Sequence, residues 1–157
     1  MAKFITFKKG EEYAARLSRL MGADQREIAG KAIHDGAEIV ANKIRANLEA
    51  NLQDPESVSK NRNLIFKNLY NVPTGALAAS FGIAKMQEDA DGYNVKIGFD
   101  GYDAKGVPNQ LKARAMESGT SKLRKRPFVR PAVQATKGAC IRKMGEIIDE
   151  EIARIMN

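Results

Sequence analysis

The residue types that most often act as nucleophiles or metal ligands occur once each in this sequence, as His34 and Cys140. A single cysteine cannot form an internal disulfide or a cysteine metal cluster, and a single histidine lacks a second nitrogen or sulfur ligand. No glycine-rich loop has the spacing of a phosphate-binding motif. We therefore predict no catalytic residue, no cofactor, no metal site and no enzymatic activity. A Cys–His nucleophile pair in a small hydrolase is the minor alternative.

Positive charge is the second chemical feature, and it is concentrated. The chain carries 26 Lys and Arg residues against 19 Asp and Glu, a net charge of +7. Residues 112–130 hold most of this excess, with Glu117 as their single acidic residue. The basic residues of this segment are Lys112, Arg114, Lys122, Arg124, Lys125, Arg126 and Arg130. A clustered basic segment fits an anionic partner, nucleic acid or an acidic protein surface, although a solvated loop is the simpler reading.

The end of the basic segment has an ordered pattern. Gly119 ends one element, a polar and basic loop follows, and Pro127 and Pro131 stiffen the entry to a helix. Phe128 is the apolar residue between these two prolines, and we expect it to anchor the entry in the core.

Two long helices must position this segment. The first is predicted from Asp24, a capping residue, to about Gln53, and the second from about Phe128 to the C-terminus. The apolar stripe of the first helix is Ile33, Ala37, Val40, Ile44 and Leu48, with Ala29, Ala32 and Ala41 on its flanks. The stripe of the second is Val133, Cys140, Met144, Ile148, Ile152 and Ile155.

Between the helices the pattern predicts a small sheet. Residues 80–86 form a strand, residues 89–92 carry turn signals, and apolar residues alternate over 93–99, which is typical of a β-hairpin with one buried face. Residues 74–79 fit a short helix or a turn. We favour a third strand for residues 115–119, where helix propensity is the competing signal.

The fold class is α+β, in one domain spanning residues 1–157. A small antiparallel sheet, made of the hairpin plus one or two further strands, is packed by the two long helices on one face. Residues 1–10 form a strand or arm, residues 11–21 a short helix, and residues 53–73 an irregular segment. We expect the arm and the irregular segment to be ordered mainly by other subunits. No apolar run is long enough for a membrane span.

The motif at the second helix supports a family assignment. Its residues are Glu117, Gly119, Thr120 and Ser121, followed by Arg126, Pro127, Phe128, Arg130, Pro131 and Ala132. This string resembles the neck and tail-completion family of long-tailed bacteriophages and prophages, which includes head–tail joining and minor tail proteins. Thr74, Gly75, Leu77 and Ser80, just before the hairpin, are similar to the family's segment at that point.

The resemblance implies a structural virion protein at the head–tail junction, a neck, tail-completion or tail-terminator protein. It would form a homo-oligomeric ring, a hexamer by preference, around the channel that DNA crosses. Its partners would be copies of itself, head-completion and tail-tube proteins and the passing DNA, with no membrane. It would be found in the virion, and in the host cytoplasm during assembly.

Within the motif, we assign oligomer or structural contacts to Glu117, Arg126, Phe128 and Arg130, since the proline-framed entry holds these residues in fixed geometry. Lys122, Arg124 and Lys125 lie on the looser loop and are the candidates for facing DNA. The alternative function is a free basic nucleic-acid-binding protein. Against it, aromatic residues make up only 6% of the chain, with no tryptophan, which leaves few stacking platforms.

Overall fold

The fold is taken from a computed structural model, which describes residues 15, 18, 21–53, 74–121 and 124–157. The predicted arm at residues 1–10 and Lys122 lie outside the described residues. The predicted helix at 11–21 and the irregular segment at 53–73 lie almost wholly outside them.

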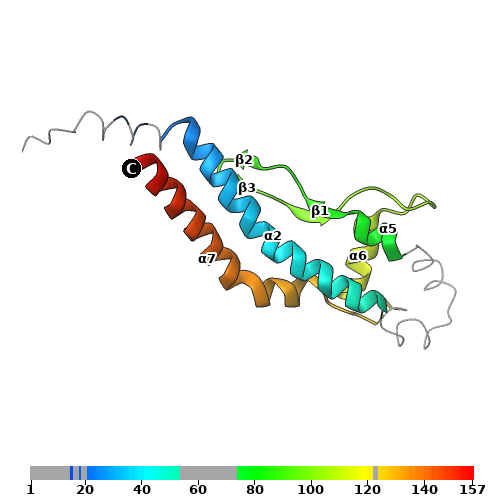
Figure 1. Cartoon of the computed structure of the whole chain (residues 1–157). Helices are drawn as coiled ribbons and strands as arrows, with labels where there is room; N and C mark the ends of the chain where they lie inside the picture. Colours follow the sequence, from blue (N-terminus) through cyan, green and yellow to red (C-terminus); the bar gives the residue numbers. More distant parts are fainter. Residues whose placement is uncertain (1–14, 16–17, 19–20, 54–73, 122–123) are drawn as a thin grey trace, which may run out of the picture.

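Helix α2 spans Ala23–Gln53 and forms the centre of the molecule (Figure 1). Its existence and bounds agree with the sequence prediction, since apolar residues recur every three or four positions and no proline interrupts it. Ile44 and Leu48 are buried as expected, but so are Ala32 and Ala41, which were placed on the flanks of the stripe. The buried surface is wider than one stripe because α2 is covered on two sides.

Helix α7 spans Val129–Met156 and runs antiparallel to α2 along one of these sides (Figure 1). Its late residue Glu151 pairs with Lys31 early in α2, at 2.5 Å between Oε1 and Nζ. This pairing raises the pKa of Lys31 and lowers that of Glu151, chiefly through the hydrogen bond between them. Helix ends far apart in the sequence are thereby held together.

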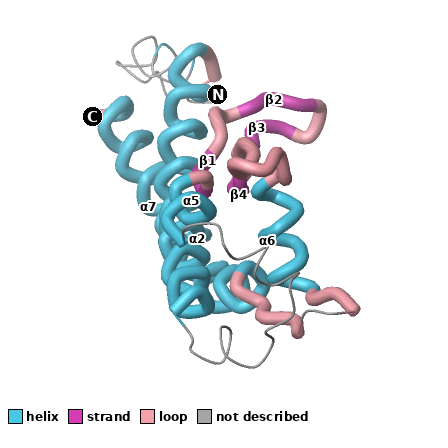
Figure 2. The backbone as a smooth tube through the Cα atoms, turned by 90° about the vertical axis from the view of Figure 1, so that its right-hand side faces the viewer, coloured by secondary structure: helices cyan, strands magenta, loops and turns pink. Residues whose placement is uncertain are grey.

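The strands lie on the other side of α2, so α2 separates them from most of α7 (Figure 2). The α+β class with two long helices and a small antiparallel strand set is confirmed. The expected packing of both helices on one face of the sheet is not observed. The strands are only three residues each, too small to cover a helix of 28 residues, so α7 packs on α2 instead.

The apolar stripe predicted for α7 also needs correction. Cys140 and Met144 face α2, but Ile148 and Ile152 are 37% and 38% exposed. The residues buried on this helix are Ala132, Ile147 and Glu151. The predicted stripe therefore combined parts of two different faces.

The four strands come from one long hairpin. Strand β1 (Phe81–Ile83) pairs with β4 (Ile97–Phe99), and β2 (Gln87–Asp89) pairs with β3 (Gly92–Asn94), all antiparallel. The register changes by one residue between the two ladders, so the first arm carries one extra residue, as in a β-bulge. This break limits the strict alternation predicted over residues 93–99. The turn residue Gly92 has φ 120°, which explains the need for glycine there.

Helix α5 (Thr74–Ala79) leads into β1, as one of the two sequence alternatives had it. Helix α6 (Asn109–Ser118) contradicts the strand predicted at residues 115–119. Asn109, Lys112, Ala113 and Met116 are buried on this helix at three- and four-residue spacing, so helix propensity prevailed. Gly119 follows with φ 74° and ends the helix.

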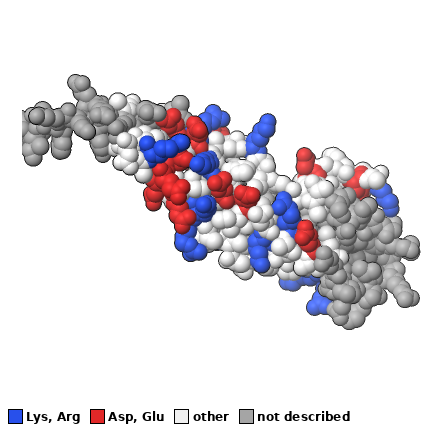
Figure 3. Space-filling view, in the orientation of Figure 1, with Lys and Arg blue, Asp and Glu red and all other residues white. Residues whose placement is uncertain are grey.

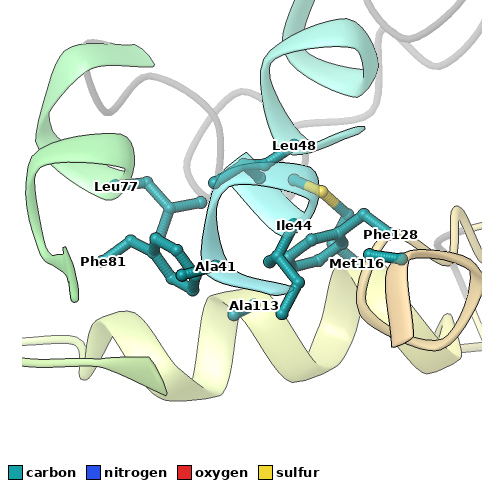
Figure 4. Packing of buried hydrophobic residues seen from close by; sticks show 9 residues of the cluster. Ala41, Ile44, Leu48, Leu77, Phe81, Ala113, Met116 and Phe128 are labelled. Atoms are coloured by element: carbon teal, nitrogen blue, oxygen red, sulfur yellow. The ribbon is translucent and has the colours of Figure 1, made fainter. Parts of the chain in front are cut away.

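The core lies where α2, α5, α6 and the start of α7 meet (Figure 4). It comprises Ala41, Ile44, Leu48, Leu77, Phe81, Ala113, Met116, Phe128 and Ala132. Phe128, Leu48 and Met116 are the largest side chains with essentially no solvent contact.

Helices α2 and α7 approach each other closely at Gly36. A Cβ atom at Gly36 would lie 2.6 Å from Met144 Cγ and 3.2 Å from Cys140 Sγ. We expect Gly36→Ala to lower the free energy of unfolding by about 1–2 kcal/mol, because overpacking outweighs the gain in helix propensity. Gly138→Ala, on α7, is the matched control: its Cβ would meet only Arg142 Nη1 at 3.6 Å, an ordinary contact, so it should raise stability by about 0.5–1 kcal/mol. Urea unfolding measures both, and equal effects would contradict the close approach.

A buried ion pair fixes the loop between β4 and α6. The side chains of Asp103 and Lys112 are each 4% exposed and form a salt bridge. Asp103 Oδ1 also accepts the backbone N–H groups of Lys105 and Val107, both at 2.8 Å. The hydrogen bond from Lys112, followed by that from Val107, lowers the pKa of Asp103 from 3.8 to about 2.

This pKa shift predicts acid sensitivity. The unfolded chain takes up the Asp103 proton near its ordinary value of 3.8, while the folded chain resists until about 2. The stabilisation from Asp103 is therefore complete above about pH 4 and lost as the pH falls towards 2. Urea midpoints over this range should fall more steeply for the wild type than for the double variant Asp103→Asn, Lys112→Met, which removes both charges. If the urea midpoints of the two proteins fell in parallel as the pH is lowered, Asp103 would not contribute to stability in this way.

Candidate functional site

The segment from the end of α6 to the first turn of α7 contains the basic loop and the helix entry. Glu117, near the end of α6, reaches this entry with its carboxylate. It accepts the backbone N–H groups of Phe128, Val129 and Arg130 at 2.7, 2.9 and 2.9 Å. These are among the N–H groups that a helix cannot satisfy internally, so Glu117 caps α7 from a different helix.

The electrostatics of Glu117 agree with this geometry. Its burial alone would raise the pKa of the carboxyl group. The backbone N–H groups of Val129, Arg130 and Phe128 outweigh burial and hold the pKa below its usual value. Glu117 is therefore ionised at neutral pH and matches the positive end of the α7 dipole.

Phe128 is fully buried at the start of α7, as expected of an anchor. Its ring meets Phe99 of β4 edge-on, with ring centroids 6.1 Å apart, and Phe99 in turn lies 5.1 Å from Phe81 of β1. Figure 4 shows Phe128 between Ile44 of α2 and Met116 of α6. One side chain thus connects α2, α6, α7 and the strands.

Two asparagines of α2 hold the backbone carbonyl groups of Arg126 and Phe128. Asn47 Nδ2 donates to the carbonyl oxygen of Phe128, and Asn51 Nδ2 donates to that of Arg126, both at 3.1 Å. The N–H of Arg126 donates to the carbonyl of Met116 at 2.8 Å. Neither Asn47 nor Asn51 was predicted from the sequence as part of this site. Their signal was two amides four residues apart beside the apolar residues Ile44 and Leu48.

The backbone of residues 124–130, held by Glu117, Asn47 and Asn51, forms a fixed frame. The basic side chains project from this frame. Arg124, Lys125 and Arg130 are exposed, and Arg126 is half-buried. Arg130 lies close enough to Glu117 to help lower its pKa. Lys112, in contrast, is buried in its ion pair with Asp103, so one member of the basic segment cannot contact a partner.

An open groove of about 1180 Å³ lies beside the helix entry. Strands β1 and β4, helix α6 and the first turns of α7 line it. Apolar side chains such as Ile83, Phe99 and Val129 form part of its wall, and Arg114 and Arg130 are its arginines. The basic frame therefore borders a concave surface.

The residues considered for catalysis are not brought together. His34 lies exposed on α2, with Nδ1 3.7 Å from Asp35 Oδ1. Cys140 is half-buried on α7, with Sγ 3.8 Å from Met144 Sδ. His34, Asp35 and Glu38 place ligand atoms within 4.8 Å of one another; they are neighbours on one helix, with His34 and Glu38 exposed and Asp35 half-buried.

The family comparison decides the assignment. The family described as "Bacteriophage HK97-gp10, putative tail-component" matches residues 11–101, more than half of the chain. The chain belongs to this family of phage tail components. The matched range covers α2, α5 and the four strands, and it ends before the motif at residues 117–132. No curated protein and no solved structure matches the chain.

Membership of the HK97-gp10-like family confirms the resemblance to phage neck and tail-completion proteins. The protein is accordingly a structural component of the phage tail, found in the virion and in contact with other phage structural proteins. In the part of the chain that the structure describes, no helix is long and apolar enough to cross a membrane.

Proposed function

We propose that this tail component forms a ring at the head–tail junction, a hexamer by preference, through which DNA passes. The proposal is supported by the entry to α7. There the buried side chain of Phe128 fixes the backbone, and exposed basic side chains project beside it. Arg124 and Lys125 are exposed beside that frame. Phosphate contacts need only positive charge near the path of the DNA, so these residues are suited to line a channel.

The proposal divides the basic segment into two roles. Arg126 and Arg130 extend from the backbone held by Asn51 and Glu117, and fixed geometry favours arginine pairing with carboxylates of a neighbouring subunit. Lys122, Arg124 and Lys125 face the DNA. The neighbours are the head-completion and tail-tube proteins, and assembly takes place in the host cytoplasm. The role is structural, without catalysis.

Charge reversal tests this division. Lys122, Arg124 and Lys125 changed together to glutamate should leave rings intact in electron micrographs, while the virions retain less DNA. Arg26, Lys43 and Lys85 changed to glutamate form the matched control with the same charge change, and DNA retention should be normal. Loss of rings from the first triple variant, with Arg126→Ala and Arg130→Ala assembling normally, would reverse the two roles.

The exposed Arg124 and Lys125 equally fit the alternative of a free nucleic-acid-binding protein. Sedimentation of the purified chain with duplex DNA at two salt concentrations distinguishes the two. A monomer with tight, salt-sensitive binding would favour the alternative over the ring.

A further inference from the structure

Helix α7 carries a second apolar face beside the one that contacts α2. Ile141, Ile148 and Ile152 are spaced by seven and four residues, which places them on one side of the helix, and they are 59%, 37% and 38% exposed. The face that contacts α2 carries Ile147 and Glu151 instead. Exposed isoleucines in a row are unusual on a helix that is free in solution.

The charges on α7 are segregated along its length. Its first half, residues 129–143, contains basic residues and no acidic ones: Arg130, Lys137, Arg142 and Lys143. Its second half contains Glu146, Asp149 and Glu150, besides Glu151, which is paired with Lys31 on the α2 side, and its only basic residue is Arg154. Figure 3 shows acidic side chains gathered towards the end where α7 finishes, on the side in view.

From these two features we infer that a second copy of the chain docks on this face, with the two α7 helices antiparallel. At about 100° per residue, Lys137, Arg142 and Asp149 border this face, whereas Lys143 and Glu150 lie on the opposite side of the helix. Antiparallel pairing places the basic half of each helix beside the acidic half of the other, whereas parallel pairing places like charges together. Ile141 of one copy then lies near Ile148 of the other, with Gly145 close to the two-fold axis. The space beside Gly145 is open, since a Cβ there would meet nothing within 4 Å. Two helices can approach closely at such a point.

This contact goes beyond the proposed ring. It is isologous, because each copy contributes the same surface, whereas the contacts that close a ring around an axis are heterologous. The α7 pairing therefore leaves the frame around Arg126 and Arg130 available for the ring contact. It also joins the free chains in pairs, or two rings face to face.

Sedimentation equilibrium of the purified full chain at tens of micromolar tests the pairing. The wild type should form a dimer, and Ile148→Glu should raise its dissociation constant by about 30-fold or more, as loss of a central interface residue does. Leu111→Glu is the matched control: Leu111 is 56% exposed on α6, outside this face, and its dimer should be unchanged. Circular dichroism melting confirms that each variant is folded.

Charge exchange tests the orientation. Lys137→Glu with Arg142→Glu should weaken the dimer, as should Glu146→Arg with Asp149→Arg. All four changes together should restore the dimer in an antiparallel pair, since opposite charges face each other again. In a parallel pair, none of the three variants would weaken it.

A monomeric wild type, or self-association that Ile148→Glu leaves unchanged, would overturn the inference. Neither result affects the ring, which is assessed in virions. Rings absent from virions would refute the proposed function and leave the dimer measurement standing.

Discussion

Replacing Phe128 with alanine is expected to lower the free energy of unfolding by about 3–5 kcal/mol, the range for a fully buried phenylalanine. The ring has no solvent exposure and touches Phe99, and its burial joins α7 to α2, α6 and the strands. Its loss leaves a cavity where α2, α6, α7 and the strands meet. Chemical unfolding followed by circular dichroism measures the loss.

Tyr102→Ala provides the matched control for an aromatic side chain. Tyr102 is 71% exposed, so its replacement should change stability by no more than about 0.5 kcal/mol. Phe128→Leu keeps most of the apolar volume and should be intermediate. A loss at Phe128 as small as that at Tyr102 would show that the ring is not an anchor.

Glu117→Ala is expected to lower the free energy of unfolding by about 2–3 kcal/mol, because the capping carboxylate and its charge are both lost. Three backbone N–H groups at the start of α7 would lose their acceptor. Glu117→Gln keeps an acceptor oxygen but not the charge, so it should recover part of the loss. Chemical unfolding of the wild type, Glu117→Gln and Glu117→Ala should give free energies of unfolding that decrease in that order.

The pH dependence separates capping from simple packing. The pKa of Glu117 is lower in the folded chain than its ordinary value of 4.5, so its contribution is complete above that value and lost as the pH falls below it. The stability gap between wild type and Glu117→Gln should therefore narrow in acid. Glu49→Ala, at an exposed position of α2, is the control and should change the free energy of unfolding by no more than about 0.5 kcal/mol. A stability difference between wild type and Glu117→Gln that does not change with pH would contradict the capping role of Glu117.

The long helices could be predicted because each obeys one strong period and carries clear end signals. For α2 this gave the correct bounds from the cap region to Gln53. The buried face of α7 could not be told apart from its exposed apolar face by sequence. Apolar residues on both faces recur at intervals of three or four residues. The strand expected at residues 115–119 was wrong because local helix propensity, the competing signal, prevails up to Ser118, and Gly119 then ends the helix.

At the candidate site, the motif itself was visible and its contacts were not. Proline spacing and the isolated Phe128 marked the helix entry from sequence alone. Glu117, on α6, caps α7 across about a dozen residues of sequence. The side-chain amides of Asn47 and Asn51 bind backbone carbonyls more than seventy residues away in the sequence. Contacts of this range depend on how α2, α6 and α7 are arranged, which no local pattern records.

Cryo-electron microscopy of purified virions is the most direct test of the central claim, that this tail component encircles the DNA channel between head and tail. We expect density at that junction in which the antiparallel α2–α7 pair and its small strand set repeat around the axis, with the basic loop after α6 facing the channel. A junction and tail fully accounted for by other chains, with no density matching this fold, would contradict it.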